Sequence, residues 1–228
     1  MTQAHFDHVA DSYDTVFSPH IVDHYASKRV ALFEELCPRG GRVLDFGCGT
    51  GVLGERLIAR GFDVFGAEYS EKMLQKALGR GVKGALLQNG RIPFEDGQFD
   101  LVYCVAVLHH LETKDNVRRA IHEMVRVAKP NARIVIWDHN PLNVFWPLLM
   151  KRWPQDHGDE RLVFLEEILD GLADEPVSGI RHWRSGWTPE FVPAFAMALM
   201  RGLEWMLERT PVIKRYSAHN IVYATKNN

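Results

Sequence analysis

The chain has few cysteines, and they form no recognisable pattern. Its 228 residues include Cys37, Cys48 and Cys104, with no Cys-x-x-Cys spacing among them. A disulfide framework or a zinc cage needs paired or clustered cysteines, so the sequence argues against both. We therefore expect a protein of a reducing, cytoplasmic compartment.

Long apolar runs and an excess of one charge are also missing. The longest apolar run, 191–200, contains Pro193 and is far shorter than the roughly 20 residues that span a bilayer. Residues 1–8 lack the basic and apolar stretches of a signal peptide. A formal net charge of −2 provides no overall basic field for nucleic acid, so we expect no nucleic-acid partner.

The remaining composition is that of a globular domain, and strand and helix patterns alternate along it. Hydrophobic residues make up 46% of the chain. A helix is expected to follow Ser18-Pro19, because serine caps and proline starts helices. Further strands are expected near 42–47, 62–67, 84–88, 99–105 and 132–138, and helices near 52–60, 70–79 and 114–128. This alternation predicts an α/β, doubly wound, mostly parallel sheet.

Tryptophan is absent from the first 136 residues, and all six tryptophans follow. Two short helices are expected within 141–178, then a strand at 179–186, a helix at 189–208 and a strand at 219–225. We expect one domain over 1–228: N-terminal helices in 1–40, a cofactor-binding core in 41–140, an aromatic-rich helical elaboration in 141–210, and the final strand in 211–228.

The most informative segment is 42–51, a short apolar strand that ends in three glycines. Glycines let a backbone approach a ligand closely, and the following helix start presents free N–H groups. Two registers fit. Gly49, Gly51 and Gly54 match the dinucleotide fingerprint, with Glu68 where a ribose-binding acid belongs. The other register runs from Asp45 through Gly47, Gly49 and Gly51.

The second register closely resembles the first motif of class I S-adenosylmethionine-dependent methyltransferases. Later segments resemble this family's motifs in order: 65–70, 92–100, 107–111 and 127–130. Residues 6–14 are similar to its N-terminal element that closes over the cofactor. The chain is similar to the subgroup that contains the ubiquinone and menaquinone methyltransferases. The resemblance implies a seven-stranded Rossmann-like sheet with S-adenosylmethionine as cofactor.

The resemblance also implies a set of cofactor contacts. Glu68 would hydrogen-bond the ribose hydroxyls. Gln88 and Asn89 replace the aspartate that usually contacts the adenine amino group, and an amide oxygen still accepts a hydrogen bond there. The full set is Tyr13, Asp45, Gly47, Cys48, Gly49, Gly51, Glu68, Tyr69, Gln88, Asn89 and Cys104. An NAD-dependent oxidoreductase using the overlapping register, or a non-catalytic S-adenosylmethionine-binding protein, remains open.

Two histidines stand where a general base would be useful. His139 ends the fifth strand and His110 follows the fourth, and strand ends line the ligand crevice of such sheets. Each has a structural alternative, as a turn or helix-start residue. The pairs His20/His24 and His5/His8 lack a third ligand, so no metal site is expected.

The tryptophan-rich region is expected to face the acceptor. Its aromatic and basic residues suit either the core of a helical cap or a lid over a small, apolar or lipid-linked acceptor. Residues 144–153 also resemble an interfacial segment, with basic residues at the end, so peripheral membrane contact is a further alternative. Nothing in the sequence indicates an oligomeric state.

Overall fold

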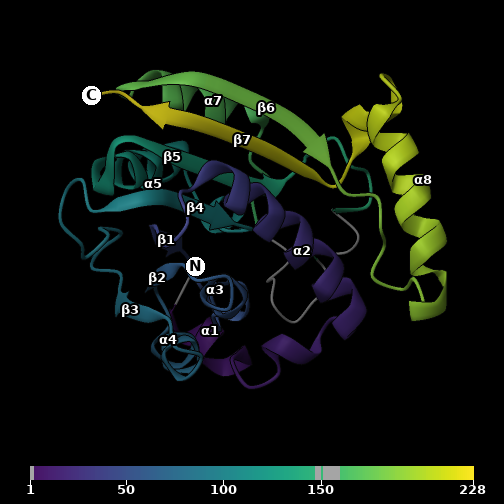
Figure 1. Cartoon of the computed structure of the whole chain (residues 1–228), viewed down its shortest axis with the longest axis horizontal. Coiled ribbons are helices and arrows are strands. Elements are labelled where there is room, and N and C mark those ends of the chain that lie inside the picture. The colour runs from purple at the N-terminus through teal and green to yellow at the C-terminus, as the bar shows by residue number, and fades with distance from the viewer. Residues whose placement is uncertain (1–2, 147–149, 151–159) are drawn as a thin grey trace.

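The computed structural model describes residues 3–146, 150 and 160–228 and is built on one twisted sheet (Figure 1). The spatial order is β3-β2-β1-β4-β5-β7-β6, with β7 antiparallel to its two neighbours and the other pairs parallel. The strands are β1 (Arg42–Phe46), β2 (Asp63–Glu68), β3 (Lys83–Leu86), β4 (Phe99–Val105), β5 (Ala128–His139), β6 (Val177–Ser185) and β7 (His219–Lys226). The predicted seven-stranded α/β fold is confirmed.

Helices cover both faces of the sheet because its central strands are apolar on both sides. On one face α5 (Lys114–Val127) and α7 (Leu165–Ala173) pack on alternate strand residues such as Leu44, Val102 and Ile134. The other face is covered by α2 (Pro19–Leu36), α3 (Val52–Ile58) and α4 (Glu71–Gly79). These helices pack on the strand residues that alternate with the first set, including Val43 and Leu101. A parallel sheet buried on both faces is the expected result.

The remaining elements lie at the rim. The short helix α1 (Gln3–Val9) and the 3-10 turn η1 (Tyr13–Thr15) precede α2, and η2 (Leu108–His110) follows β4. The helix α8 (Met197–Arg209), between η4 (Ala194–Ala196) and η5 (Ile213–Tyr216), runs along the edge of the molecule (Figure 1). Among the described helices, none is long and apolar enough to cross a membrane.

The C-terminal elaboration differs most from expectation. The helix predicted at 189–208 begins only at Met197, because Pro189 and Pro193 restrict the backbone before them. Of the two helices expected within 141–178, α7 is described, whereas 147–149 and 151–159, with most of the proposed interfacial segment, lie outside the described residues.

Strand β5 is also longer than predicted. It begins at Ala128, so the sequence Lys129-Pro130-Asn131 lies within it rather than before it. The strand irregularity there, opposite Phe99–Leu101, accommodates Asn131 at a φ of 64°. The Lys129 ammonium lies 2.7 Å from the Asp100 carboxylate, which ties this segment to β4.

Candidate functional site

The glycine turn after β1 is held by a carboxylate from β2. Both strands end at the same edge of the sheet, which brings Glu68 beside the turn. One Glu68 oxygen accepts the Gly49 N–H at 2.8 Å, and the other accepts those of Tyr69 and Ser70 at 2.7 and 3.0 Å. Burial raises the pKa of Glu68, and the three amide donors oppose that shift. The acid that the sequence predicted for ribose therefore also shapes the turn.

The three glycines of the turn have different roles. All three adopt positive φ, a region that favours glycine. A Cβ at Gly47 would lie 2.4 Å from Val107, and one at Gly51 2.7 Å from the Cα of Ala77 in α4. A Cβ at Gly49 would meet no atom within 4 Å. Packing therefore requires Gly47 and Gly51, whereas Gly49 faces open space.

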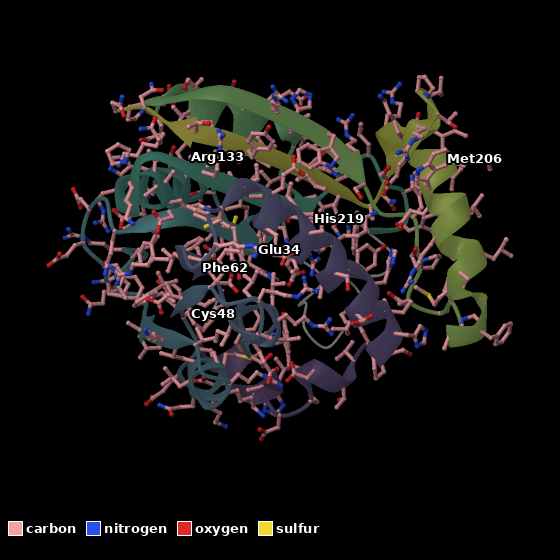
Figure 2. The ribbon with its side chains drawn as sticks, viewed as in Figure 1. Glu34, Cys48, Phe62, Arg133, Met206 and His219 are labelled. Atoms are coloured by element: carbon pink, nitrogen blue, oxygen red, sulfur yellow. The ribbon has the colours of Figure 1, made fainter. Side chains whose placement is uncertain are left out.

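A cavity of about 520 Å³ lies beside this turn. Its floor includes Asp45, Gly47 and Gly49 from the turn region, and residues of α2 form one wall. The C-terminal region closes the other side with rings and loop residues. Figure 2 labels two lining residues, Cys48 from the turn and His219 from β7. Aromatic side chains that line it are Tyr13, Phe17, Tyr25, Phe145, Trp146, Trp187 and Phe191.

Two charged groups of opposite sign lie in this cavity. Asp45 is buried, and its carboxylate accepts a hydrogen bond from the Tyr103 hydroxyl at 2.8 Å. Burial raises the Asp45 pKa to about 7. On α2, burial lowers the pKa of Arg29 to about 10, and its buried Nε has no hydrogen-bond partner among the described residues. The cavity thus offers an anionic and a cationic group to one ligand.

The N-terminal residues fasten onto the same turn. Asp7 on α1 accepts from the Ser70 hydroxyl at 2.5 Å, and that hydroxyl also caps α4. Asp14 in η1 accepts from the Thr50 hydroxyl at 2.6 Å and from Arg80 at 2.7 Å. Through these bonds the segment that carries Tyr13 lies over the cavity.

A stack of aromatic rings lies across the cavity from α2. His109 lies between His110, with ring centroids 3.9 Å apart, and His139, at 4.2 Å. His139 in turn stacks on Trp146 at 3.7 Å. His109, His110 and His139 all line the cavity. Both predicted histidines are therefore brought together with a third, His109.

His109 is the member of this stack that a carboxylate orients. Its Nδ1 lies 2.7 Å from Oδ1 of Asp138, and both side chains are buried. The Leu108 and His139 N–H groups also donate to this carboxylate, at 2.6 and 2.7 Å. Although burial opposes it, His109 and these amides lower the Asp138 pKa. A carboxylate that accepts from Nδ1 places the proton of the neutral His109 ring on that nitrogen.

His139 has a different environment. Burial, together with His109 and His219, lowers its pKa well below the usual range. Its Nδ1 has no hydrogen-bond partner among the described residues. A histidine with so low a pKa is a weak base at neutral pH.

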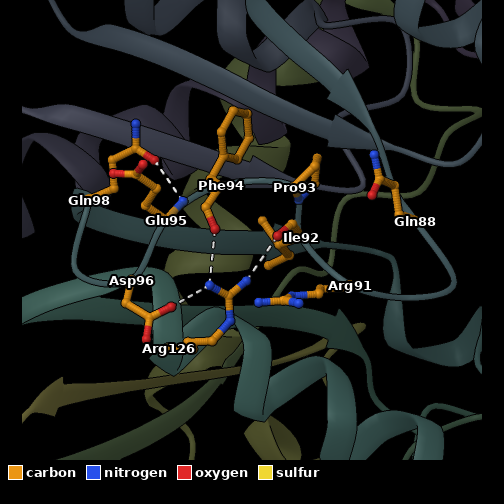
Figure 3. Close-up of a pocket in the computed structure, with 9 residues that line it drawn as sticks. All are labelled: Gln88, Arg91, Ile92, Pro93, Phe94, Glu95, Asp96, Gln98 and Arg126. Atoms are coloured by element: carbon orange, nitrogen blue, oxygen red, sulfur yellow. Dashed lines mark hydrogen bonds and ion pairs between the residues drawn. The ribbon is translucent and has the colours of Figure 1, made fainter.

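Six of the expected cofactor residues do not line this cavity: Gly51, Glu68, Tyr69, Gln88, Asn89 and Cys104. Cys104 is fully buried in the core beneath α5, and Tyr69 is largely exposed. Gln88 and Asn89 belong to an exposed Asn-Gly turn in which Asn89 has a φ of 52°, closed by two hydrogen bonds between Gln88 and Arg91. Gln88 lines a separate polar groove in which Arg126 bonds Asp96 and two backbone carbonyls (Figure 3).

The histidine pairs considered as metal ligands serve other contacts. His20 Nε2 lies 2.7 Å from the Val192 carbonyl oxygen, and His24 Nε2 lies 2.7 Å from Glu204. His109, Asp138 and His139 do place ligand atoms within 4.8 Å of one another. The Asp138 carboxylate already accepts hydrogen bonds from His109 and from two backbone N–H groups, so its burial is explained without a metal ion. The expected absence of a metal stays a prediction.

Sequence reasoning missed Arg29, His109 and Asp138. Arg29 lies one α2 turn from Tyr25 and reads as a surface residue of an amphipathic helix. The adjacent His109 and His110 differ only in which side of η2 they occupy, which the sequence does not show. The one available signal was an acid, Asp138, at the end of an otherwise apolar strand.

Comparison with known proteins agrees with this geometry. Residues 44–136 match the model of the family described as Methyltransferase domain. This part of the chain is therefore similar to methyltransferase domains. The matched residues include the glycine register that starts at Asp45 and the later motifs up to 127–130. The dinucleotide register does not explain those later motifs. S-adenosylmethionine is the cofactor of such domains, and it is bound in one solved complex of a Haemonchus contortus neighbour.

Individual relatives match over part of their length. The probable tRNA methyltransferase 9B of Bos taurus is 32% identical over 132 residues, 57% of this chain and 28% of that protein. The demethylmenaquinone methyltransferase of Clavibacter sepedonicus is 33% identical over 139 residues, 58% of this chain and 56% of that protein. The chain thus spans less than two thirds of the length of these relatives.

The fold is shared more widely than the sequence. An S-adenosylmethionine-dependent methyltransferase from Thermotoga maritima superposes with a TM-score of 0.71 at 17% identity, covering 98% of this chain and 99% of that one. The similarity therefore extends through the C-terminal elaboration, which the family model does not match.

Proposed function

We propose that this protein transfers a methyl group from S-adenosylmethionine to a small, largely apolar acceptor that must lose a proton. One observation carries the proposal: the cavity that holds the glycine turn also holds His109, a histidine oriented by a buried aspartate. A carboxylate-oriented imidazole that lines a ligand cavity is a common arrangement for a general base. Acceptors with a hydroxyl or an acidic carbon need such a base.

The residues of the cavity fit this cofactor. Gly49 leaves space where a side chain would intrude, and Glu68 keeps lone-pair capacity for ribose hydroxyls after accepting three amides. Asp45 and Arg29 provide opposite charges for the ammonium and carboxylate of the methionyl end. When bound, S-adenosylmethionine supplies an electrophilic methyl on a sulfonium that leaves as a neutral thioether.

The protein's own contribution is alignment, exclusion of water and one proton transfer. Nε2 of His109 takes the acceptor proton as the acceptor's electron pair forms the new bond, and Asp138 stabilises the resulting imidazolium. The aromatic lining excludes water from the acceptor side. Alignment and general base catalysis together account for the required rate enhancement without a metal.

The names of relatives support two acceptor classes, quinone precursors and tRNA. We favour a small acceptor because the cavity is lined by aromatic rings and the chain carries a net charge of −2. A tRNA acceptor remains the second candidate on the strength of the relatives' names.

The test measures cofactor binding first and turnover second. S-adenosylmethionine should raise the melting temperature and NAD should not, because a ligand stabilises the state that binds it. Labelled methyl should then appear in catechol- or quinol-type acceptors and not in unmodified tRNA. Stabilisation by NAD alone would refute the proposed function, and methylation of tRNA alone would refute the acceptor class.

A further inference from the structure

The segment 191–216, which contains α8, has an unusual distribution of exposed side chains. Large apolar side chains face solvent along it: Phe191 is 81% exposed, Phe195 90% and Leu199 79%. Trp205, Met206 and Val212 are each more than half exposed. Isolated exposed apolar residues are ordinary, whereas a contiguous set on one segment marks an interaction surface. We call this set the outer face of α8.

Charges in this segment separate by sign. Its exposed charged residues are all basic: Arg201, Arg209, Lys214 and Arg215. Its two acids, Glu204 and Glu208, point inward. Glu204 lies 2.7 Å from both His24 and the Trp187 N–H, and Glu208 lies 2.7 Å from both Lys28 and the Ser185 hydroxyl. The acids thus fasten α8 to the protein and leave the exposed charges of this segment cationic, with the exposed Asp23 carboxylate of α2 near Arg201.

Two of the cations lie on aromatic rings. The Arg209 guanidinium lies 4.0 Å from the Trp205 ring centroid, and that of Arg215 lies 5.2 Å from the Tyr216 ring centroid. Such pairs present an apolar body and a charged tip to the same side. In Figure 1, α8 runs along the margin of the molecule, and Met206 projects from it in Figure 2.

We propose that the outer face of α8 binds the surface of an anionic lipid bilayer. Apolar side chains combined with basic ones alone are the composition of a helix that lies in the membrane interface. A second copy of this chain fits less well, because a symmetric contact would bring the same four cations against one another.

The acceptor cavity opens beside this face. Phe191 belongs to the outer face, and both Phe191 and the exposed Phe145 line the cavity. An acceptor dissolved in a bilayer would enter past them without crossing water. Resting on the proposed function, this identifies the acceptor as a lipophilic molecule.

The test is co-sedimentation of the full chain with phosphatidylglycerol or phosphatidylcholine vesicles. We expect about tenfold tighter binding to the anionic vesicles, reduced by high salt. The double variants Phe195→Ser/Leu199→Ser and Arg201→Glu/Arg209→Glu should each weaken binding about tenfold. Matched controls are Ile180→Ser/Trp183→Ser on β6 and Arg39→Glu/Arg119→Glu far from α8, which should bind as the unchanged chain does.

Equal binding to both vesicle types, or unchanged binding by both α8 variants, would overturn the proposal. A dimer that Phe195→Ser/Leu199→Ser dissociates would also overturn it, because the face would then join two copies. Thermal stabilisation by S-adenosylmethionine, measured on every variant, checks folding. A chain that binds vesicles but is not stabilised by this cofactor would refute the proposed function and leave the membrane surface intact.

Discussion

The cofactor side and the acceptor side of this cavity are built differently. On the cofactor side, the Glu68 and Asp138 carboxylates are held by backbone N–H groups at strand ends. On the acceptor side, contacts are made by side chains from distant segments, such as His24 with Glu204 and Tyr25 with the Thr188 carbonyl. Backbone N–H groups are present whatever residues carry them, so hydrogen bonds to them keep the cofactor side in place. Contacts between side chains depend on residue identity, so the acceptor side can differ between proteins with different ligands.

The largest expected effect is on the residue where the two sides meet. His109→Gln should lower kcat by about 10²–10⁴ with an acceptor that must lose a proton, because the general base is lost, and should leave S-adenosylmethionine affinity within about threefold. Radiolabel transfer and calorimetry measure the two quantities. His122→Gln, on an exposed histidine of α5, is the control. An undiminished kcat would remove His109 from the mechanism.

Acid should weaken the acceptor side first. Burial lowers the pKa of His219 to about 3, so the unfolded chain binds a proton below about pH 6.5 that the folded chain does not. The free energy of unfolding should fall by about 2 kcal/mol between pH 7 and 5.

A second loss should follow at lower pH. Although burial opposes it, the bonds from His24, Lys28 and the Trp187 amide lower the Glu204 pKa to about 2. Stability from Glu204 is present above about pH 4.5 and should decline by about 2 kcal/mol as the pH falls to 3. Urea titrations at each pH measure both losses. His219→Asn should remove the His219 share of the first loss and leave the share of His139, whose pKa burial also lowers; exposed His182→Asn should change neither loss.

A matched glycine pair separates packing from binding on the cofactor side. Gly51→Ala should cost about 2–4 kcal/mol of stability, because the new methyl meets the Ala77 backbone in addition to the φ strain. Gly49→Ala should cost only the strain, about 1–2 kcal/mol, but should weaken S-adenosylmethionine binding more. Denaturation and calorimetry test this, and equal stability losses would contradict it.

The smallest predicted effect concerns ribose. Glu68→Ala should weaken S-adenosylmethionine binding at least tenfold, about 1.4 kcal/mol, through loss of charge-assisted hydrogen bonds. Glu71→Ala, at an exposed position of α4, should bind normally. Calorimetry at 25 °C measures both, and an unchanged affinity for the Glu68 variant would remove it from the cofactor site.

Local sequence patterns sufficed for the sheet and the turn because each is encoded by neighbouring residues. Apolar strands, capping residues such as Ser70 and Thr113, and glycines at positive φ act over a few positions. Of the predicted cofactor residues, Asp45, Gly47 and Gly49 line the cavity, and Glu68 bonds the turn that contains them. Gln88 and Asn89 lie in an exposed Asn-Gly turn outside its lining, and their contact with the cofactor stays a prediction.

Only the tertiary structure decided which distant groups line the cavity. Arg29 from α2, His109 from η2, Trp146 and His219 meet in one cavity although they come from segments up to 190 residues apart. His109 was proposed as the base rather than His110 because the Asp138 carboxylate of β5 contacts it. The exposed charges of α8 are basic because its two acids pair with His24 and Lys28 of α2. Sequence periodicity indicates which side of an element is buried, whereas long-range packing determines what that side meets.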